Sequence, residues 1–107
     1  MHTTNTSVLA RRVRISDEFA TLAFEAGWAT EALFFVQTEG EHPDLTLIAE
    51  VSPDGVNWRP RAETTLPSDE SLVDLPVDRF GNWLRMRVVG ATADAGARIL
   101  IHLNLKG

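Results

Sequence analysis

Residues 45–58, with the sequence LTLIAEVSPDGVNW, constrain the fold of this chain more than any other stretch. Apolar side chains alternate along the first half, and residues two apart lie on one face of a strand. That face would carry Leu45, Leu47, Ala49 and Val51. Ser52-Pro53-Asp54-Gly55 then favours a tight turn, because proline pre-sets φ for the second position and glycine accepts positive φ at the exit. The stretch predicts a β-hairpin whose second strand restarts at Val56-Asn57-Trp58.

Several further segments share the period of two that is typical of strands. They are residues 7–15, 31–38, 71–75, 82–89 and 97–105. Glu63 to Glu70 reads as a polar loop.

The stretch near Phe24 is ambiguous. Its apolar residues fit a helix over 17–26 as well as a strand over 18–24. We favour the strand, with Ala20, Leu22 and Phe24 facing inward, because Gly27 closes it and the rest of the chain is β.

A chain of 107 residues with 44% hydrophobic residues is long enough for one packed domain. About seven to eight short strands without a convincing long helix predict an all-β fold. We expect a single antiparallel β-sandwich, jelly-roll-like in its winding. Residues 7–107 would form this domain, and the threonine-rich residues 1–6 would form a flexible N-terminal arm.

Charge and composition narrow the classes of partner. The net charge of −5 argues against broad binding of nucleic acid or of anionic membranes, which require a basic face. The chain has no cysteine, which rules out disulfides and thiolate chemistry. No apolar stretch approaches the roughly 20 residues of a membrane span, and the start lacks the apolar region of a signal peptide. We therefore expect a cytoplasmic or virion-associated protein.

No constellation of catalytic or metal-binding residues stands out. His2, His42 and His102 are too scattered for a ligand spacing. Two acidic clusters, near His42 and over 69–78, fit solvated loops better than calcium loops. No nucleophile elbow and no glycine-rich phosphate loop appears. We expect no catalytic site, no metal site and no cofactor, and hence a protein that is not an enzyme.

Several residues are candidates for contacts with other proteins. The arginines of the first strand (Arg12 and Arg14) and of the seventh (Arg85 and Arg87) could meet acidic loops of a neighbouring protein. With Arg11, which is also in the first strand, they would form one basic patch if the two strands were adjacent. The segment 31–38 is apolar on both faces, so it should be central in its sheet or covered by a partner. The interface candidates are Arg12, Arg14, Phe34, Trp58, Arg85 and Arg87.

Two stretches carry a resemblance to known proteins. The form S-x-D-G-x-x-W at 52–58 resembles a hairpin of small β-sandwich proteins in phage and prophage virions, which have tail and head-decoration roles. The run FGNWLRMRV at 80–88, followed by Gly90-Ala91-Thr92, is similar to a later strand of such proteins. The hairpin also looks like the Asp-box of sialidase-type propellers, but it lacks one residue and occurs only once. In either family this segment is a structural turn, so the resemblance implies no active site.

We therefore expect a non-catalytic structural or assembly protein that acts through protein–protein contacts. Its partners would be copies of itself or the other subunits of a larger particle. The alternative is a carbohydrate-binding β-sandwich module, because an aromatic ring suits the apolar face of a sugar. Trp28, Trp58 or Trp83 would then form the platform, with a glycan as partner.

Overall fold

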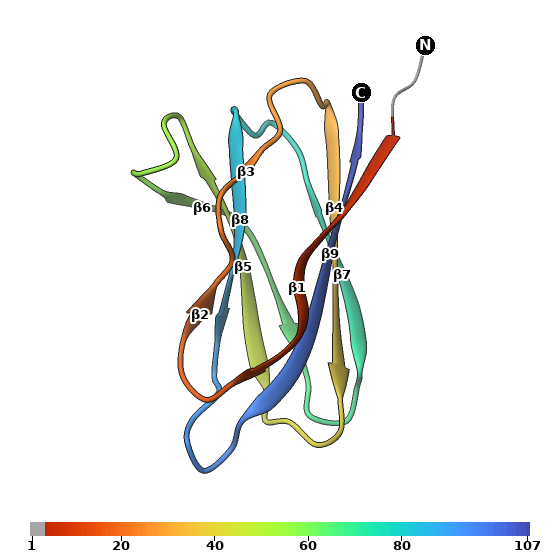
Figure 1. The fold of residues 1–107 in the computed structure, drawn as a ribbon, viewed down its shortest axis with the longest axis vertical. Helices are drawn as coiled ribbons and strands as arrows, with labels where there is room; N and C mark the ends of the chain where they lie inside the picture. Colours follow the sequence, from red (N-terminus) through yellow and green to blue (C-terminus); the bar gives the residue numbers. More distant parts are fainter. Residues whose placement is uncertain (1–3) are drawn as a thin grey trace.

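The computed structural model describes residues 4–107, which form nine strand segments and no helix. The strands make two antiparallel sheets that pack face to face, and these stand side by side in Figure 1. The predicted all-β antiparallel sandwich is confirmed. Across the described residues, no helix has the length and apolar character to cross a membrane.

The first layer, sheet A, has four strands in the order β1-β9-β4-β7. Their bounds are β1 Thr4–Ile15, β9 Ala97–Lys106, β4 Glu31–Glu39 and β7 Leu72–Val77. The doubly apolar segment around Phe34 is therefore central, as expected. β7 lies at an edge, where Pro76 is tolerated because an edge strand needs fewer backbone donors.

The second layer, sheet B, has the order β2-β8-β5-β6, with β3 also paired to β8. Its strands are β2 Phe19–Ala20, β8 Trp83–Val89, β5 Leu45–Ser52, β6 Arg59–Leu66 and β3 Phe24–Glu25. β5 and β6 form the predicted hairpin, although the second strand begins at Arg59. β6 is an edge strand, as the proline in it suggested, and its register shifts beside Pro60. The loop expected over 63–70 is wrong in its first half, because β6 continues to Leu66.

The chain winds between the two layers. Apart from the β5–β6 hairpin and the two short segments on β8, consecutive strands lie in different sheets. Counting β2 and β3 as one interrupted strand gives eight, which is the upper end of the expected number, in an order that agrees with jelly-roll-like winding.

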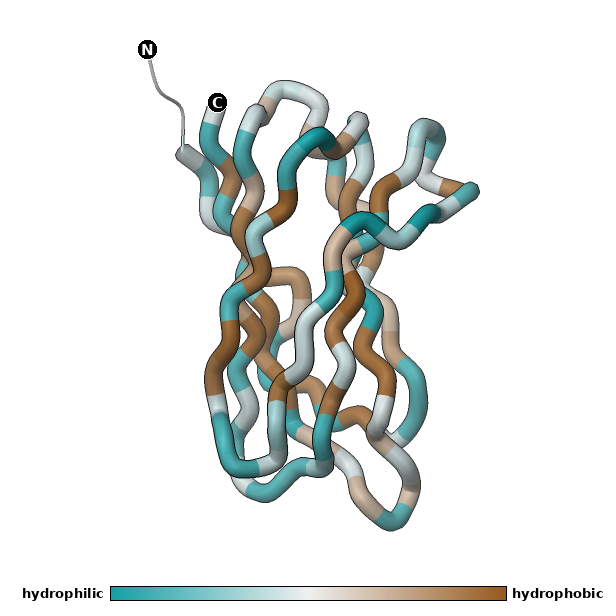
Figure 2. The backbone as a smooth tube through the Cα atoms, turned by 180° about the vertical axis from the view of Figure 1, so that it is seen from behind, coloured by the Kyte–Doolittle hydropathy of each residue, from teal (hydrophilic) through white to brown (hydrophobic). Residues whose placement is uncertain are grey.

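The core fills the space between the sheets. Figure 2 shows hydrophobic and hydrophilic residues alternating along the strands, which is the pattern that sends every second side chain inward. The largest fully buried side chains are Phe34, Leu45, Leu47, Leu66, Leu84, Met86, Ile99, Ile101, Leu103, Leu105, Val36 and Val88. β9 follows the predicted facing, with Ile99 to Leu105 inward at every second position.

Residues 4–6, which we expected in a flexible arm, form the start of β1 and pair with β9. Residues 1–3 of that arm lie outside the described part. Whether this region is mobile in solution stays a prediction.

The strand expected over 18–24 is broken, and its predicted facing is wrong at Ala20 and Leu22, whereas Phe24 packs against the core as expected. Thr21 is buried, whereas Leu22 is 89% exposed and Ala20 is exposed. The reason is hydrogen bonding to β8. The Thr21 backbone N–H donates to the Met86 carbonyl and the Thr21 hydroxyl accepts from the Met86 N–H, and these two bonds fix the direction in which the segment faces.

Candidate interaction surfaces

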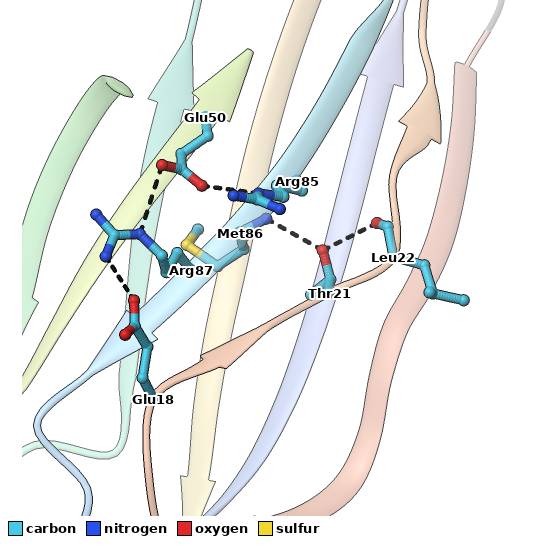
Figure 3. A network of polar contacts seen from close by, with 7 residues as sticks. All are labelled: Glu18, Thr21, Leu22, Glu50, Arg85, Met86 and Arg87. Carbon is cyan, nitrogen blue, oxygen red and sulfur yellow. Dashed lines mark hydrogen bonds and ion pairs between the residues drawn. The ribbon is translucent and has the colours of Figure 1, made fainter. Parts of the chain in front are cut away.

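The outer face of sheet B carries a network of ion pairs, drawn in Figure 3. β8 alternates, so Leu84, Met86 and Val88 are buried and the arginines between them point outward. The register of β5 sets Glu50 directly opposite Arg85. The Arg85 Nε donates to Glu50 Oε1 at 2.7 Å, and Arg87 Nε lies 3.4 Å from Glu50 Oε2.

Glu50 is buried among these groups, with only 5% of the residue exposed. Burying a carboxylate is expensive unless cations and hydrogen bonds compensate it. The two arginines supply both, and arginine stays protonated at physiological pH. The sequence pattern could have revealed Glu50, since it falls on the outward side of β5 while the arginines fall on the outward side of β8.

A second carboxylate ties the segment before β2 to this network. Arg87 Nη1 donates to Glu18 Oε1 at 2.5 Å. The hydrogen bond with Glu18 is the largest cause of the pKa of Arg87 being raised above its ordinary value, and the charge of Glu50 adds to it. Thr21 continues the attachment, because its Oγ1 accepts from the Met86 N–H at 3.1 Å and donates to the Leu22 carbonyl (Figure 3).

Trp58 covers the network from the hairpin side. The centroid of its ring lies 4.4 Å from Arg85 Cζ, which is a cation–π distance. Arg85, Arg87 and Trp58 are therefore bonded within their own chain. The expectation that these two arginines are free to meet the acidic loops of a neighbour is not supported by this geometry.

The hairpin turn is a closed set of local hydrogen bonds. Asp54 Oδ1 accepts from the backbone N–H groups of Val56 and Asn57, each at 2.9 Å, and Ser52 Oγ accepts from Gly55 N–H at 2.8 Å. The bonds from the backbone of Asn57 and of Val56 hold the pKa of Asp54 well below its usual range. The hydrogen bonds that this carboxylate accepts all come from residues of its own turn, so the segment acts as a structural element.

A single basic patch required the first and seventh strands to be neighbours, and this condition is not met. β1 belongs to sheet A and β8 to sheet B, so the arginines of the two strands lie on different layers. On β1, Arg12 sits at an irregular position with φ of 49° and donates from Nε to Glu39 at 3.1 Å. Arg12 and Arg14 are both exposed. Arg12 is therefore also paired within its own chain, but both arginines keep a larger exposed surface than Arg85 and Arg87.

Phe34 is corrected as an interface candidate, because it is fully buried in the core at 0% exposure. The apolar side chains of β4 that face outward are Leu33 and Phe35. Strand pairing sets them beside Asn104 and His102 of β9, and His102 lies on the outward face as expected. Val8 on β1 and Leu72 on β7 flank them, with exposed fractions of 39% and 53%, and Leu100 of β9 lies beside Gln37. We call this outward surface of Leu33, Phe35, Leu100, Val8 and Leu72 the apolar band.

A shallow hollow of about 470 Å³ opens at one end of the apolar band. It is lined by Glu31, Ala32, Leu33, Pro76, Val77, Asp78, Asn104 and Lys106. The Asn104 Oδ1 atom is buried there without a hydrogen-bond partner. The hollow thus combines one unpaired acceptor, Asn104 Oδ1, with the acids Glu31 and Asp78, the base Lys106 and several apolar side chains.

The three tryptophans do not form a common platform. Trp58 stacks on Arg85, and the ring of Trp83 lies against Gly55, where an added Cβ would be 3.5 Å away. Trp28 lies in the loop between β3 and β4 and is 43% exposed. Of the three tryptophans, it is the most exposed.

Metal-ligating residues do not gather in the described chain. Among residues 4–107, no group of three or more His, Asp or Glu side chains could hold a metal ion. His42 is buried, with Nδ1 2.7 Å from the Pro43 carbonyl oxygen and Nε2 2.6 Å from the Glu70 carbonyl oxygen. Both ring nitrogens are thus occupied by backbone oxygens, and His42 joins the loop before β5 to the loop before β7.

Comparisons with known proteins show similarity of fold. No protein-family profile and no curated protein matches the sequence. Among solved structures, the PBSX exported protein XepA aligns with a TM-score of 0.74 at 13% identity, over 94% of this chain and 36% of XepA. The SPBc2 prophage-derived protein YomS aligns with a TM-score of 0.68 at 8% identity, over 100% of this chain and 96% of YomS.

A third similar structure comes from Bacillus endospore appendages, described as a family of disulfide-linked pili. It aligns with a TM-score of 0.64 at 11% identity, over 97% of this chain and 86% of the other. The chain therefore spans about a third of XepA but nearly all of YomS and most of the appendage protein. At these identities the likeness establishes the sandwich fold.

Proposed function

We propose that this protein is a non-catalytic structural subunit of a larger protein assembly of the virion type, in a decoration, tail or shell-associated role. The observation that carries the proposal is the apolar band on the outer face of sheet A. An apolar surface rimmed by charged residues is typical of protein–protein contacts. Phe35 and Leu72 belong to it, whereas the outer face of sheet B is closed by its own ion pairs.

The fold comparisons support the same role. YomS, a prophage-derived protein, and the appendage protein, a pilus subunit, share this sandwich over most of their lengths. This chain has no cysteine, so an assembly of its copies would be held by non-covalent contacts and not by the disulfides named for those pili.

Sedimentation of the wild-type chain from low to high micromolar concentration tests this proposal. We expect a reversible, concentration-dependent oligomer. A chain that stays monomeric over the whole range would contradict a role in assembly.

The alternative, a carbohydrate-binding module, is favoured only by the exposure of Trp28. Titration of the chain with soluble glycans, followed by tryptophan fluorescence, tests it. A saturable change that disappears in the Trp28→Ala variant would support the module, and an unchanged spectrum would remove it.

A further inference from the structure

We propose that the outer face of sheet A is the contact between two copies of this chain, which pack face to face about a twofold axis parallel to the strands. The inference rests on the proposed function, because it names the surface and the symmetry through which such a subunit would assemble.

The size and chemistry of this face suit a dimer. No segment of the described chain lies over it, since sheet A forms one flank of the molecule (Figure 1). Four strands spaced by about 4.8 Å, with about 30 Å of strand length, present on the order of 600 Å² per copy. That area is at the lower end of specific interfaces, which bury roughly 800 Å² per partner. Phe35 lies near its middle, paired with His102.

Charges at the two ends of the face follow a simple rule. The middle strands are β4 and β9, and β4 carries acids where β9 carries bases. Glu31 is paired with Lys106 at one end, and Glu39 with Arg98 at the other. Each end of the face therefore holds one acid and one base, side by side on the two central strands.

This pattern selects one symmetry. A twofold axis parallel to the strands, between β4 and β9, lays β4 of one copy over β9 of the other. Glu31 then faces Lys106 of the second copy, Glu39 faces Arg98, and Phe35 faces His102. An axis across the strands would instead lay β4 over β4 and set Glu31 against Glu39. Like charges in contact oppose association, so the first arrangement is favoured.

The outer strands support the same choice. The parallel axis lays β1 over β7 of the second copy. β1 carries exposed Arg12 and Arg14 toward the end where Arg14 pairs with Arg98, whereas β7 carries exposed Asp74 and is preceded at that same end by exposed Glu70. Facing sheets keep their strands within about 30° of each other, so these long side chains stay within reach of their counterparts. This contact would give Arg12 and Arg14 a role in an interface.

Charge reversal tests the arrangement. Glu31→Lys alone and Lys106→Glu alone should each raise the dimer dissociation constant about tenfold or more, because each creates two like-charge contacts per dimer. An equimolar mixture of the two variants should recover wild-type affinity as a heterodimer, since all contacts between the copies are again of opposite sign. Sedimentation velocity measures all three samples. Glu63→Lys, an exposed site on sheet B, is the matched control and should leave the dimer unchanged.

A second variant addresses the centre of the face. Phe35→Lys should abolish the dimer, while circular dichroism and thermal unfolding show that the fold is retained. Tighter association of Glu31→Lys, or single variants that weaken the dimer without recovery on mixing, would overturn the proposed symmetry. A wild-type oligomer that survives both reversals and Phe35→Lys would overturn the contact face and leave the proposed function standing. A monomeric wild type would instead contradict the proposed function itself.

Discussion

Arg85 and Glu50 face each other across β8 and β5, with Nε and Oε1 2.7 Å apart, and the ring of Trp58 covers the arginine. This pair links the middle of sheet B to its hairpin. It also compensates a carboxylate that is almost completely buried. The outer surface of sheet B is thereby closed by groups of its own chain.

The Glu50→Gln variant should lower the free energy of unfolding by about 2 kcal/mol. Removing one member of a buried ion pair costs about 3–5 kcal/mol, and we expect less here because both arginines keep some access to water. Urea denaturation measures the difference. Glu63→Gln on the neighbouring edge strand should change the stability by less than about 0.5 kcal/mol. Equal effects of the two substitutions would contradict the role given to Glu50.

Acid should weaken the hairpin through Asp54. Hydrogen bonds from the backbone of Asn57 and Val56 lower its folded pKa, whereas an unfolded aspartate titrates near about 3.9. The stabilisation is therefore fully present above that unfolded value and is lost as the pH falls toward the lower folded pKa. Asp54→Ala should unfold at a lower temperature at neutral pH and should lose less stability than the wild type on acidification.

Thermal unfolding at neutral pH and at about pH 3, below the unfolded value, measures this effect of Asp54. The exposed Asp69→Ala variant serves as the control. Its stability should depend on pH in the same way as that of the wild type. A parallel pH dependence of Asp54→Ala and wild type would refute the assignment.

Gly90 and Gly40 should respond differently to alanine. Both have positive φ, at 124° and 77°, but a Cβ on Gly90 would come within 2.5 Å of the Asp44 carbonyl oxygen, and one on Gly40 would meet nothing within 4 Å. Gly40→Ala should cost about 1 kcal/mol from backbone strain alone. Gly90→Ala should cost about 3 kcal/mol or more, because overpacking adds to the strain. Denaturant titration of both variants gives the comparison.

Thr21 should be sensitive to loss of its hydroxyl. Thr21→Val keeps the shape but leaves the buried Met86 N–H without its acceptor, which should cost about 1–3 kcal/mol. Thr21→Ser keeps the oxygen and should recover most of the loss. Amide exchange at Met86, followed by NMR, should become faster in the valine variant only. An unchanged exchange rate would show that the bond is unimportant.

Truncation of the neighbouring residues Phe34 and Phe35 should reduce the stability of the protein by very different amounts. Phe34→Ala removes a fully buried ring and should cost about 3–5 kcal/mol. Phe35→Ala removes a ring from the outer face and should cost about 1 kcal/mol. Unfolding at low protein concentration keeps the oligomer from contributing to the difference. Similar losses for the two would mean that the facing of β4 is wrong.

Alternation along the chain predicted the strands whose two faces differ in polarity. β8 and β9 are of this kind, with Met86 inside and Arg85 outside, and the hairpin was defined by its turn residues. β4 could not be oriented in this way, because Phe34 and Phe35 are equally apolar and only the tertiary packing decides which one is buried.

Two other features depend on which strands become neighbours. Alternation contains no information about the layer to which a strand belongs, so it could not decide whether the arginines of β1 and β8 share one patch, and they lie on different sheets. The predicted facing of the segment near Leu22 was wrong for a local reason. Its facing follows the hydrogen bonds of Thr21 to Met86, and these reverse what hydropathy alone would favour.

The pairing of β1 with β9 has a consequence for biosynthesis. β9 is the one strand that neighbours β1 within the described sheet, and the two are separated by nearly the whole sequence. A nascent chain leaves the ribosome with β1 first, at roughly 5–20 residues per second. The backbone groups of β1 that pair with β9 therefore stay without their strand partner until almost the whole chain has been synthesised. Such distant partners also make for a high contact order and slow closure, so the newborn polypeptide is most vulnerable to aggregation or to chaperone capture in that interval.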